Sequence, residues 1–464
     1  RFTHYDYWSD QLKPDILSWS GADMLLYGMG ERALKDLVQL MEKGVPFESL
    51  KTLPQTAVRV PAGNPLPRNK KWSDTELYSH EVCLTDKEKF ALNFRRIEEE
   101  SNRLHPARLH QVCGYQRVVV NPALPPATEK EMDEIYDLPY TRLPHPRYRK
   151  KGPIPAFEMI KHSVNLHRGC FGGCSFCTIS AHQGKFISSR SEGSILREVK
   201  QITQAEDFKG HLSDLGGPSA NMYRMQGIDL TICEKCRRPS CIYPSICHNL
   251  NTSHQPLLDV YRKTDQLPGI KKSFIGSGIR YDMLLNPKAS EEEKKTHKAY
   301  IRELITRHVS GRLKVAPEHS SDKVLKKMRK PSFELFRKFH VIFNKINQEA
   351  GLNQQLIPYF ISSHPGCEEK DMAWLAAETR SLNFAPEQVQ DFTPTPMTLA
   401  TVMYYTGLDP YSLKEVYVPK NKEEKQRQRQ YFFWYKPDVR KELEKRLKKA
   451  GWTDVYRKLF EKKR

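Results

Sequence analysis

The chain has no uninterrupted apolar run that approaches the length needed to cross a bilayer, and no signal-peptide pattern opens it. Hydrophobic residues make up only 38% of its 464 residues. These absences argue against membrane-spanning and secreted classes, so we expect a soluble protein with no membrane partner. A chain of this length can still bury a large core in two or three domains. Position 1 is Arg rather than Met, and we expect the numbering to begin inside a longer natural protein.

The chain has ten cysteines, and seven of them lie in two tight clusters. In a chain of this length, such clustering indicates metal ligands in a reducing compartment rather than the disulfide framework of a secreted protein. We therefore expect a cytoplasmic protein.

The first cluster lacks a fourth ligand. Cys170, Cys174 and Cys177 have the spacing C-x3-C-x2-C, with Gly172 and Gly173 between the first two. A structural zinc site needs four protein ligands, and no Cys or His follows at the spacing of a finger or ribbon. Three thiolates on one tight loop instead suit an iron–sulfur cubane with one iron open to a small molecule. The alternatives are a disulfide pair with a spare thiol, or inert buried cysteines.

The sequence around these cysteines resembles the cluster motif of radical S-adenosylmethionine (SAM) enzymes, with Phe176 as the aromatic residue before the third cysteine. Longer segments resemble the YgiQ-type branch, and the resemblance covers nearly the whole chain. They are SVNLHRGCFGGC (163–174), SSRS (188–191), LSDLGGPSANMY (212–223) and QDFTPTPM (390–397). The resemblance implies a [4Fe-4S] cluster on the three cysteines, with Phe176 beside the cofactor. It also implies reductive cleavage of SAM to methionine and a 5′-deoxyadenosyl radical, with an electron donor such as flavodoxin or ferredoxin.

The second cluster has four thiols within fifteen residues, at Cys233, Cys236, Cys241 and Cys247. Four ligands can close a tetrahedral zinc site or hold a complete iron–sulfur cubane, and spacing alone does not choose between them. The thiols lie in an expected insertion, residues 225–255, near the mouth of a predicted strand. We therefore expect an auxiliary cluster that helps to bind substrate or passes electrons. The alternative is a zinc clip that folds an insertion with little core of its own.

Residues 1–60 contain a strand, a glycine turn and an amphipathic helix between positions 22 and 41. This segment resembles the end of the Rossmann-like domain that precedes the barrel in cobalamin-binding radical enzymes. The chain has no Asp-x-His-x-x-Gly sequence, so we infer no cobalamin site. Residues 61–160 are rich in proline and charge, and we expect a connector that wraps around the protein, with one helix over 86–103. A flexible linker is the alternative.

Residues 161–406 alternate short apolar runs with longer helical ones. The expected strands end near Arg168, Leu215, Ile279, Ala316, Ile361 and Phe392. The expected helices include 191–204, 290–309 with a capping box at Ser290 and Glu293, and 331–350 with four core phenylalanines. Six strand–helix repeats predict an α/β fold with a parallel sheet, most naturally a partial (β/α)6 radical SAM barrel. In such barrels the chemistry lies at the carboxyl ends of the strands.

Three of these strand ends carry candidate cofactor-binding residues. Gly216 and Gly217 follow the second strand, where related enzymes carry a Gly-Gly-Glu that holds the amino group of SAM, although Pro218 replaces the Glu here. A bare turn is the alternative. Arg280 follows the third strand and offers a planar fork for a carboxylate, unless it is an ordinary surface arginine. Glu318 ends the fourth strand and could accept hydrogen bonds from ribose hydroxyls.

The fifth strand leads into two candidate catalytic residues, His364 and Cys367. We expect both to face the mouth of the barrel, where Cys367 could donate a hydrogen atom to a radical. The alternative for a lone thiol is a small buried residue.

The chain has a net charge of +20, which favours anionic partners. Half of this excess lies in residues 411–464, within an expected basic helical extension over 407–464. Its aromatic run, 431–435, could stack on RNA bases. The helical spacing of Leu443, Leu447 and Ala450 instead favours a docked amphipathic helix.

The sequence thus predicts a radical SAM enzyme whose substrate is an unknown RNA, protein or metabolite. A non-catalytic iron–sulfur or zinc protein that binds nucleic acid is the alternative.

Overall fold

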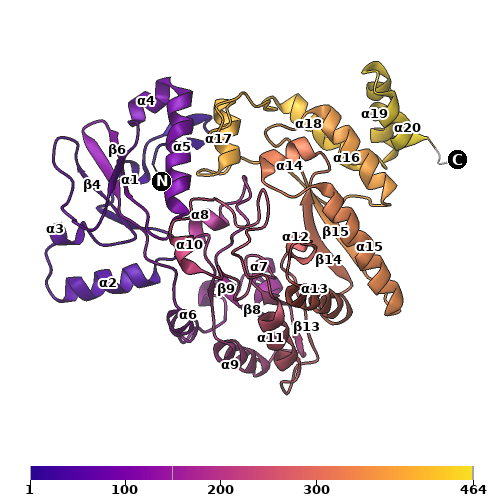
Figure 1. Ribbon diagram of the computed structural model, residues 1–464, viewed down its shortest axis with the longest axis horizontal. Helices are drawn as coiled ribbons and strands as arrows, with labels where there is room; N and C mark the ends of the chain where they lie inside the picture. Colours follow the sequence, from indigo (N-terminus) through magenta and orange to yellow (C-terminus); the bar gives the residue numbers. More distant parts are fainter. Residues whose placement is uncertain (1, 149, 462–464) are drawn as a thin grey trace.

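The computed structural model describes residues 2–148 and 150–461, which form a mixed α/β protein (Figure 1). A five-stranded sheet from the first 120 residues lies on one side, and parallel strands from residue 163 onward lie on the other. Within the two described ranges, every helix is too short or too polar to span a bilayer.

The N-terminal sheet has the strand order β3-β4-β7-β6-β5. Its strands are β3 (Met24–Leu26), β4 (Thr56–Pro61), β5 (Asp74–Glu76), β6 (Arg108–Cys113) and β7 (Gln116–Val120). β4, β7 and β6 form an antiparallel centre, in which the buried Val58 pairs with Val119. Gly114 has a φ of 57°, and this conformation allows the tight hairpin between β6 and β7.

The first 160 residues also form helices. They are α1 (Ile16–Ser20), α2 (Glu31–Glu42), α3 (Phe47–Leu50), α4 (His80–Thr85), α5 (Lys87–Ser101), α6 (Glu129–Tyr136), η1 (Pro146–Tyr148) and α7 (Pro155–Ile160). The helix predicted over 86–103 is confirmed as α5, which begins where the Asp86 carboxylate accepts hydrogen bonds from the N–H groups of Glu88 and Lys89.

The predicted division between residues 60 and 61 is wrong, because it falls inside β4 and divides one sheet. The segment expected as a connector, 61–160, supplies β5, β6 and β7. The strand and helix expected between 22 and 41 form as β3 and α2, but β3 pairs antiparallel with β4, unlike the parallel strands of a Rossmann-like sheet. The strands of this region are short and separated by prolines, so their alternation is hard to detect in the sequence.

From residue 163 onward, most strands pair in parallel. The strands are β8 (Ser163–Asn165), β9 (His167–Arg168), β10 (Ser188–Ser189), β11 (His211–Leu212), β12 (Asp214–Gly216), β13 (Lys272–Ser273), β14 (Arg312–Glu318), β15 (Gln355–Ser362) and β16 (Gln388–Asp391). β8 pairs with β12, β11 with β13, and β15 with both β14 and β16. The antiparallel pair of β9 and β10 is the exception among the described strands of this region. Each predicted strand position therefore has a strand, although the third ends earlier than expected, at Ser273.

The helices of this region pack around the strands. They are α8 (Ile179–Gln183), α9 (Glu192–Thr203), α10 (Leu230–Glu234), α11 (Gln255–Asp265), α12 (Tyr281–Leu284), α13 (Glu291–Glu303), the π-helix η2 (Leu304–His308), α14 (Asp322–Met328), α15 (Phe333–Glu349), α16 (Glu369–Ser381) and α17 (Leu399–Thr406). The capping box of Ser290 and Glu293 is confirmed, and the four phenylalanines of α15 are buried as predicted. Burial of each such ring stabilises the fold by about 1.5–3 kcal/mol.

The two end segments of the chain meet, because Lys425 Nζ donates to the Tyr7 hydroxyl at 3.2 Å. The hairpin of β1 (His4–Asp6) and β2 (Gln11–Lys13) packs the ring of Tyr5 against Tyr405 of α17. The last helices are α18 (Lys422–Gln430), η3 (Tyr431–Phe433), α19 (Pro437–Lys449) and α20 (Thr453–Phe460). Tyr431, Phe432, Leu443 and Leu447 are buried, so the first two residues of the aromatic run pack against the protein.

Candidate functional site

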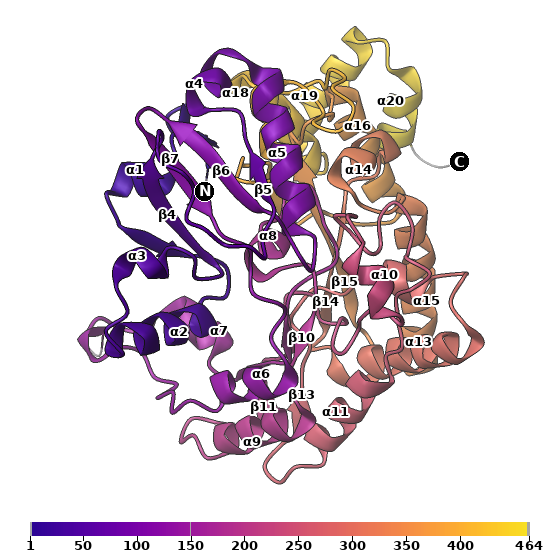
Figure 2. The same ribbon diagram turned by 60° about the vertical axis from the view of Figure 1, so that its left-hand side comes forward.

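The three cysteines of the first cluster lie in the loop between β9 and α8. Figures 1 and 2 both show α8 between the N-terminal sheet and the parallel strands. Each sulfur accepts one N–H hydrogen bond. The contacts are Gly172 N to Cys170 Sγ at 3.4 Å, Ile179 N to Cys177 Sγ at 3.5 Å, and Arg280 Nη1 to Cys174 Sγ at 3.6 Å. Such donors favour the thiolate form that iron binds, so this donor set fits an iron–sulfur cluster.

Two glycines make this loop tight. A Cβ atom on Gly172 would lie 2.9 Å from Arg280 Nη1 and 3.3 Å from Cys170 Sγ. Gly173 has a φ of 60°, and a Cβ atom there would lie 2.5 Å from the backbone oxygen of Pro239. Any larger residue would therefore push the loop away from the segment that carries the second cluster.

Burial disfavours free thiolates in this loop. It raises the pKa of Cys170, and burial together with the neighbouring Cys174 raises the pKa of Cys177 to about 12. A positively charged metal core would offset this cost, because metal binding takes the place of the thiol protons.

Arg280 lies behind the loop and is only 9% exposed, so the surface alternative for this residue is wrong. Its Nε and Nη2 donate to the Asp282 carboxylate at 3.0 and 2.6 Å, and its Nη1 points to Cys174. The guanidinium fork therefore holds a carboxylate of this chain and reaches a cluster ligand at the same time.

Glu318 is buried at the end of β14, with a φ of 67°. Lys330 Nζ lies 3.5 Å from its Oε1, while its Oε2 has no hydrogen-bond partner among the described residues. Burial raises its pKa above the usual range for a glutamate. A buried acceptor without a partner fits the predicted role toward ribose hydroxyls.

Gly216 and Gly217 lie where β12 ends, and they pack against the strand that leads into the cysteine loop. The Gly216 oxygen accepts a hydrogen bond from Leu166 N at 2.7 Å. A Cβ atom on Gly217 would lie only 2.5 Å from the ring of His167. His167 is fully buried, neither ring nitrogen has a partner among the described residues, and burial lowers its pKa to about 4. The sequence reasoning missed His167, although it lies three residues before Cys170.

The prediction that His364 and Cys367 face an open mouth is wrong, because both side chains are fully buried. His364 Nε2 lies 3.1 Å from Ser175 Oγ, and its ring meets Phe176 edge-on at 6.0 Å, so it supports the cysteine loop from behind. Gln428 of α18 covers the turn and donates to the Cys367 oxygen at 2.7 Å. The sequence could not show that α18 folds over this strand end.

The second cysteine cluster packs directly against the first loop. Cys241 N donates to the Phe171 oxygen at 3.0 Å, and Ser240 Oγ donates to the same oxygen at 3.1 Å. Cys233 Sγ accepts a hydrogen bond from Asn249 Nδ2 at 3.5 Å. Over residues 2–148 and 150–461, no three His, Cys, Asp or Glu side chains stand close enough together to hold a single metal ion.

Lys185 is a further residue of this region that the sequence did not reveal. It is 1% exposed, and its Nζ donates to the Arg238 oxygen at 2.9 Å and contacts Cys236 Sγ at 3.8 Å. Neither of these partners of Nζ within the described ranges is a carboxylate. A buried ammonium needs a negative neighbour, and the thiolates of the second cluster would supply that charge.

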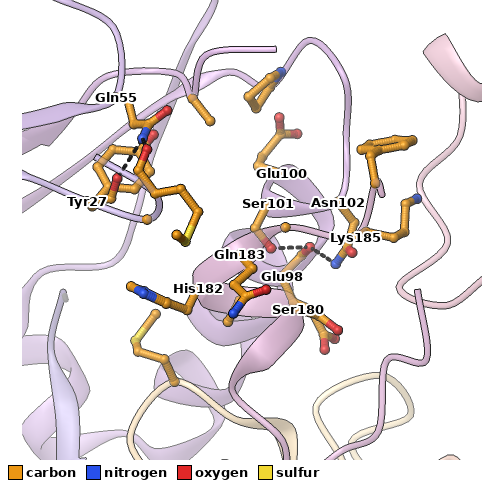
Figure 3. A pocket seen from close by; sticks show the side chains of 18 of the residues that line it. Tyr27, Gln55, Glu98, Glu100, Ser101, Asn102, Ser180, His182, Gln183 and Lys185 are labelled. Carbon is orange, nitrogen blue, oxygen red and sulfur yellow. Dashed lines mark hydrogen bonds between the residues drawn. The ribbon is translucent and has the colours of Figure 1, made fainter. Parts of the chain in front are cut away.

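A cavity of about 630 Å³ separates the N-terminal sheet from the cysteine loop. Cys174 and Cys177 both line it, and neither Gly216, Gly217, Arg280 nor Glu318 does. Figure 3 shows Tyr27 and Gln55 on the sheet side, with Ser180, His182 and Gln183 of α8 opposite them. Its volume is typical of a site for a small organic molecule.

Comparison with known proteins found two family models and several relatives. Residues 1–163 match the model described as radical SAM N-terminal, and residues 387–458 match a domain of unknown function, DUF3362. A UPF0313 protein of Porphyromonas gingivalis is 59% identical over 463 residues, covering 100% of this chain and 72% of that protein. One from Bacteroides thetaiotaomicron is 57% identical, covering 100% and 76%, and one from Methanocella arvoryzae is 43% identical, covering 98% and 73%.

Among solved structures, the chain is similar to the radical SAM methyltransferase TsrM from Kitasatospora setae with cobalamin and a [4Fe-4S] cluster bound. The identity is 12% and the TM-score is 0.41, over 84% of this chain and 56% of that one. This chain therefore spans little more than half the length of that protein, and a similarity of this size does not establish a shared fold.

Proposed function

The chain belongs to the UPF0313 family, and from that premise we propose that it is a radical SAM enzyme with a [4Fe-4S] cluster on Cys170, Cys174 and Cys177. The observation that carries the proposal is the loop itself, with three thiols that each accept an N–H and two that open onto a cavity. The match of residues 1–163 to the radical SAM N-terminal model supports the same class.

The parallel strands would form the partial (β/α)6 barrel of this class, because the pairs β8–β12 and β11–β13 and the three strands β14, β15 and β16 are all parallel and are joined by helices. When bound, a cluster with an open iron supplies the electron that cleaves SAM to methionine and a 5′-deoxyadenosyl radical. Glu318 would accept hydrogen bonds from the ribose hydroxyls of SAM. Gly217 would let the backbone at the end of β12 lie against the His167 ring, where any Cβ atom would collide. Arg280 would hold Cys174 in place and lend positive charge to the cluster.

We further propose that Cys233, Cys236, Cys241 and Cys247 hold a second iron–sulfur cluster. Two observations support it, namely the buried ammonium of Lys185 beside Cys236 and the direct contact of this segment with the first loop. These four thiols would hold the group that supplies one-electron transfer between a donor such as flavodoxin or ferredoxin and the site of Cys170, Cys174 and Cys177. A net charge of +20 would favour association with an acidic donor.

The first proposal is tested by anaerobic reconstitution of the protein, addition of dithionite and SAM, and chromatography for 5′-deoxyadenosine. We expect product from the wild type and only background from Cys174→Ala. Cys113→Ala is the matched control, because Cys113 lies on β6, outside both clusters. A fully iron-loaded wild type that forms no 5′-deoxyadenosine would refute the proposal and favour a binding protein with structural metals.

The second proposal is tested by quantifying iron and zinc. Two cubanes would bring about eight iron atoms per chain, and Cys236→Ala should retain about four. Cys236→Ala should still cleave SAM with dithionite as the reductant, because the first cluster remains. About one zinc per wild-type chain would contradict the second cluster and favour a structural clip.

A further inference from the structure

The cavity beside Cys174 and Cys177 has mainly apolar walls. Leu25, Ala57, Leu109 and Val120 come from the N-terminal sheet, Ile97 from α5, and Met397 from the segment before α17. Walls of this kind bind a ligand through its apolar surface, and a few polar groups then fix its orientation.

The charged side chains that line the cavity are already paired within the chain. The pairs are Arg32 with Glu131 at 3.0 Å, Arg103 with Glu100 at 3.0 Å, Arg168 with Glu31 at 2.9 Å, and Glu98 with Arg329 at 2.7 Å. Lys185 is held by the Arg238 oxygen and Cys236. None of the cations that line the cavity is therefore left over to neutralise a phosphate, within the described ranges.

Polar groups remain available on the α8 side of the cavity (Figure 3). Gln183 Oε1 accepts a hydrogen bond from Gly169 N at 3.0 Å, and this contact leaves the amide NH₂ free to donate. His182 is exposed at the cavity wall. Both residues lie on the short helix that begins just after Cys177.

We propose that this cavity binds the substrate of the radical chemistry, and that the substrate is an uncharged, mainly apolar small molecule whose polar group contacts His182 and Gln183. The inference rests on the proposed function, because the two thiols on the cavity wall place the cavity beside the radical source. It narrows the substrate from RNA, protein or metabolite to one chemical class.

The distribution of charge argues against RNA as the substrate in this cavity. RNA binding depends on cations that neutralise phosphates. Half of the surplus of basic residues lies in residues 411–464. Figure 1 shows the last helices, α19 and α20, at the far end of the molecule from α2, and none of the described residues of this segment lines the cavity. Whatever binds that surface does so away from the cysteine loop.

The test uses the reconstituted protein and two probes, the uncharged apolar dye Nile red and a fluorescein-labelled single-stranded RNA of mixed sequence. Two variants fill the cavity from opposite walls, Ala181→Trp on α8 and Ala123→Trp in the loop after β7, because both alanines are exposed and line it. Ala450→Trp is the matched control, since this exposed alanine caps α19 elsewhere.

We expect Nile red to bind the wild type and the control equally, and to bind each filled variant at least about tenfold more weakly. Iron content reports that the variants have folded around their cluster. Equal dye binding by the wild type and both filled variants would overturn the inference. It would also be overturned if the labelled RNA bound the wild type but not the two filled variants, because RNA would then occupy the cavity. The separate 5′-deoxyadenosine assay on the wild type shows whether the proposed function itself has failed.

Discussion

The two cysteine clusters lie on segments that contact each other, but they differ in the number of thiols, in their exposure to the cavity and in the cation beside them. The first has three thiols, opens onto a cavity and is supported by Arg280, whose charge is balanced by Asp282. The second has four thiols, none of which lines that cavity, and is supported by Lys185, which has no carboxylate partner among the described residues.

This difference separates two roles for the same ligand type. A site with three thiols and an open side can bind a small molecule on its metal, whereas a site with four thiols and a buried cation can store charge without a ligand. The contact of Cys241 N with the Phe171 oxygen joins the two sites through the backbone.

The largest expected difference between the sites comes from removing one thiol of each. Cys177→Ala should lower 5′-deoxyadenosine formation by more than about 100-fold, because two thiols do not hold a cubane. Cys247→Ala should lose iron from the second site and keep dithionite-driven SAM cleavage within a few-fold of the wild type. An equal loss of 5′-deoxyadenosine formation in Cys177→Ala and Cys247→Ala would contradict the different roles given to the two sites.

The buried cation of the first site should matter strongly for stability. Arg280→Met leaves the Asp282 carboxylate buried without its partner and should lower the free energy of unfolding by about 3–5 kcal/mol. Arg302→Met removes an exposed ion pair with Glu349 and should cost less than about 1 kcal/mol. Anaerobic urea denaturation measures both, and similar losses would show that Arg280 is not specially placed.

The stability of the folded protein should depend on pH through His167, which lies three residues before Cys170. Burial lowers the pKa of His167 from 6.5 to about 4. Between these two pH values the imidazole is protonated in the unfolded chain but stays neutral in the folded protein. Folded stability therefore falls with falling pH, and His167→Gln should remove about 2 kcal/mol of that loss between pH 7 and 5. Urea denaturation at both pH values measures it. His105→Gln, at an exposed position, is the control, and an unchanged slope in His167→Gln would contradict the assignment.

The smallest expected effect concerns the cation of the second site. Lys185→Met removes positive charge next to Cys236, so the reduction potential of the second cluster should become more negative, whereas Lys185→Arg should stay near the wild type. Redox titration followed by electron paramagnetic resonance measures the shift. The reduction potential of the first cluster should stay the same in both variants. A shift in the potential of the first cluster alone would contradict the assignment of Lys185 to the second site.

The features that the sequence predicted well are those with a local periodicity. The phenylalanines of α15 and the capping box at Ser290 depend on spacing along one helix, and the structure has both. The parallel strands between 163 and 391 were predictable in position for the same reason, since each buried run is short and followed by a helix.

The features that the sequence did not predict depend on contacts between distant segments. The cavity joins the N-terminal sheet to α8, and consecutive strands of that sheet are separated by as many as 31 residues, at positions 77–107. Lys185 is one of many lysines until the fold places it beside Cys236. His364 and Cys367 lie at a strand end as predicted, but Gln428, more than sixty residues away, closes that end.

The central claim is that the three-thiol site leaves one iron free for SAM. It is tested most directly by electron paramagnetic resonance of the reduced Cys247→Ala variant, in which the first cluster is the only complete one, before and after addition of SAM. The account predicts that SAM changes the shape and g-values of the cluster signal, because the cofactor binds the open iron. A signal that is present at full intensity and does not change with saturating SAM would contradict it.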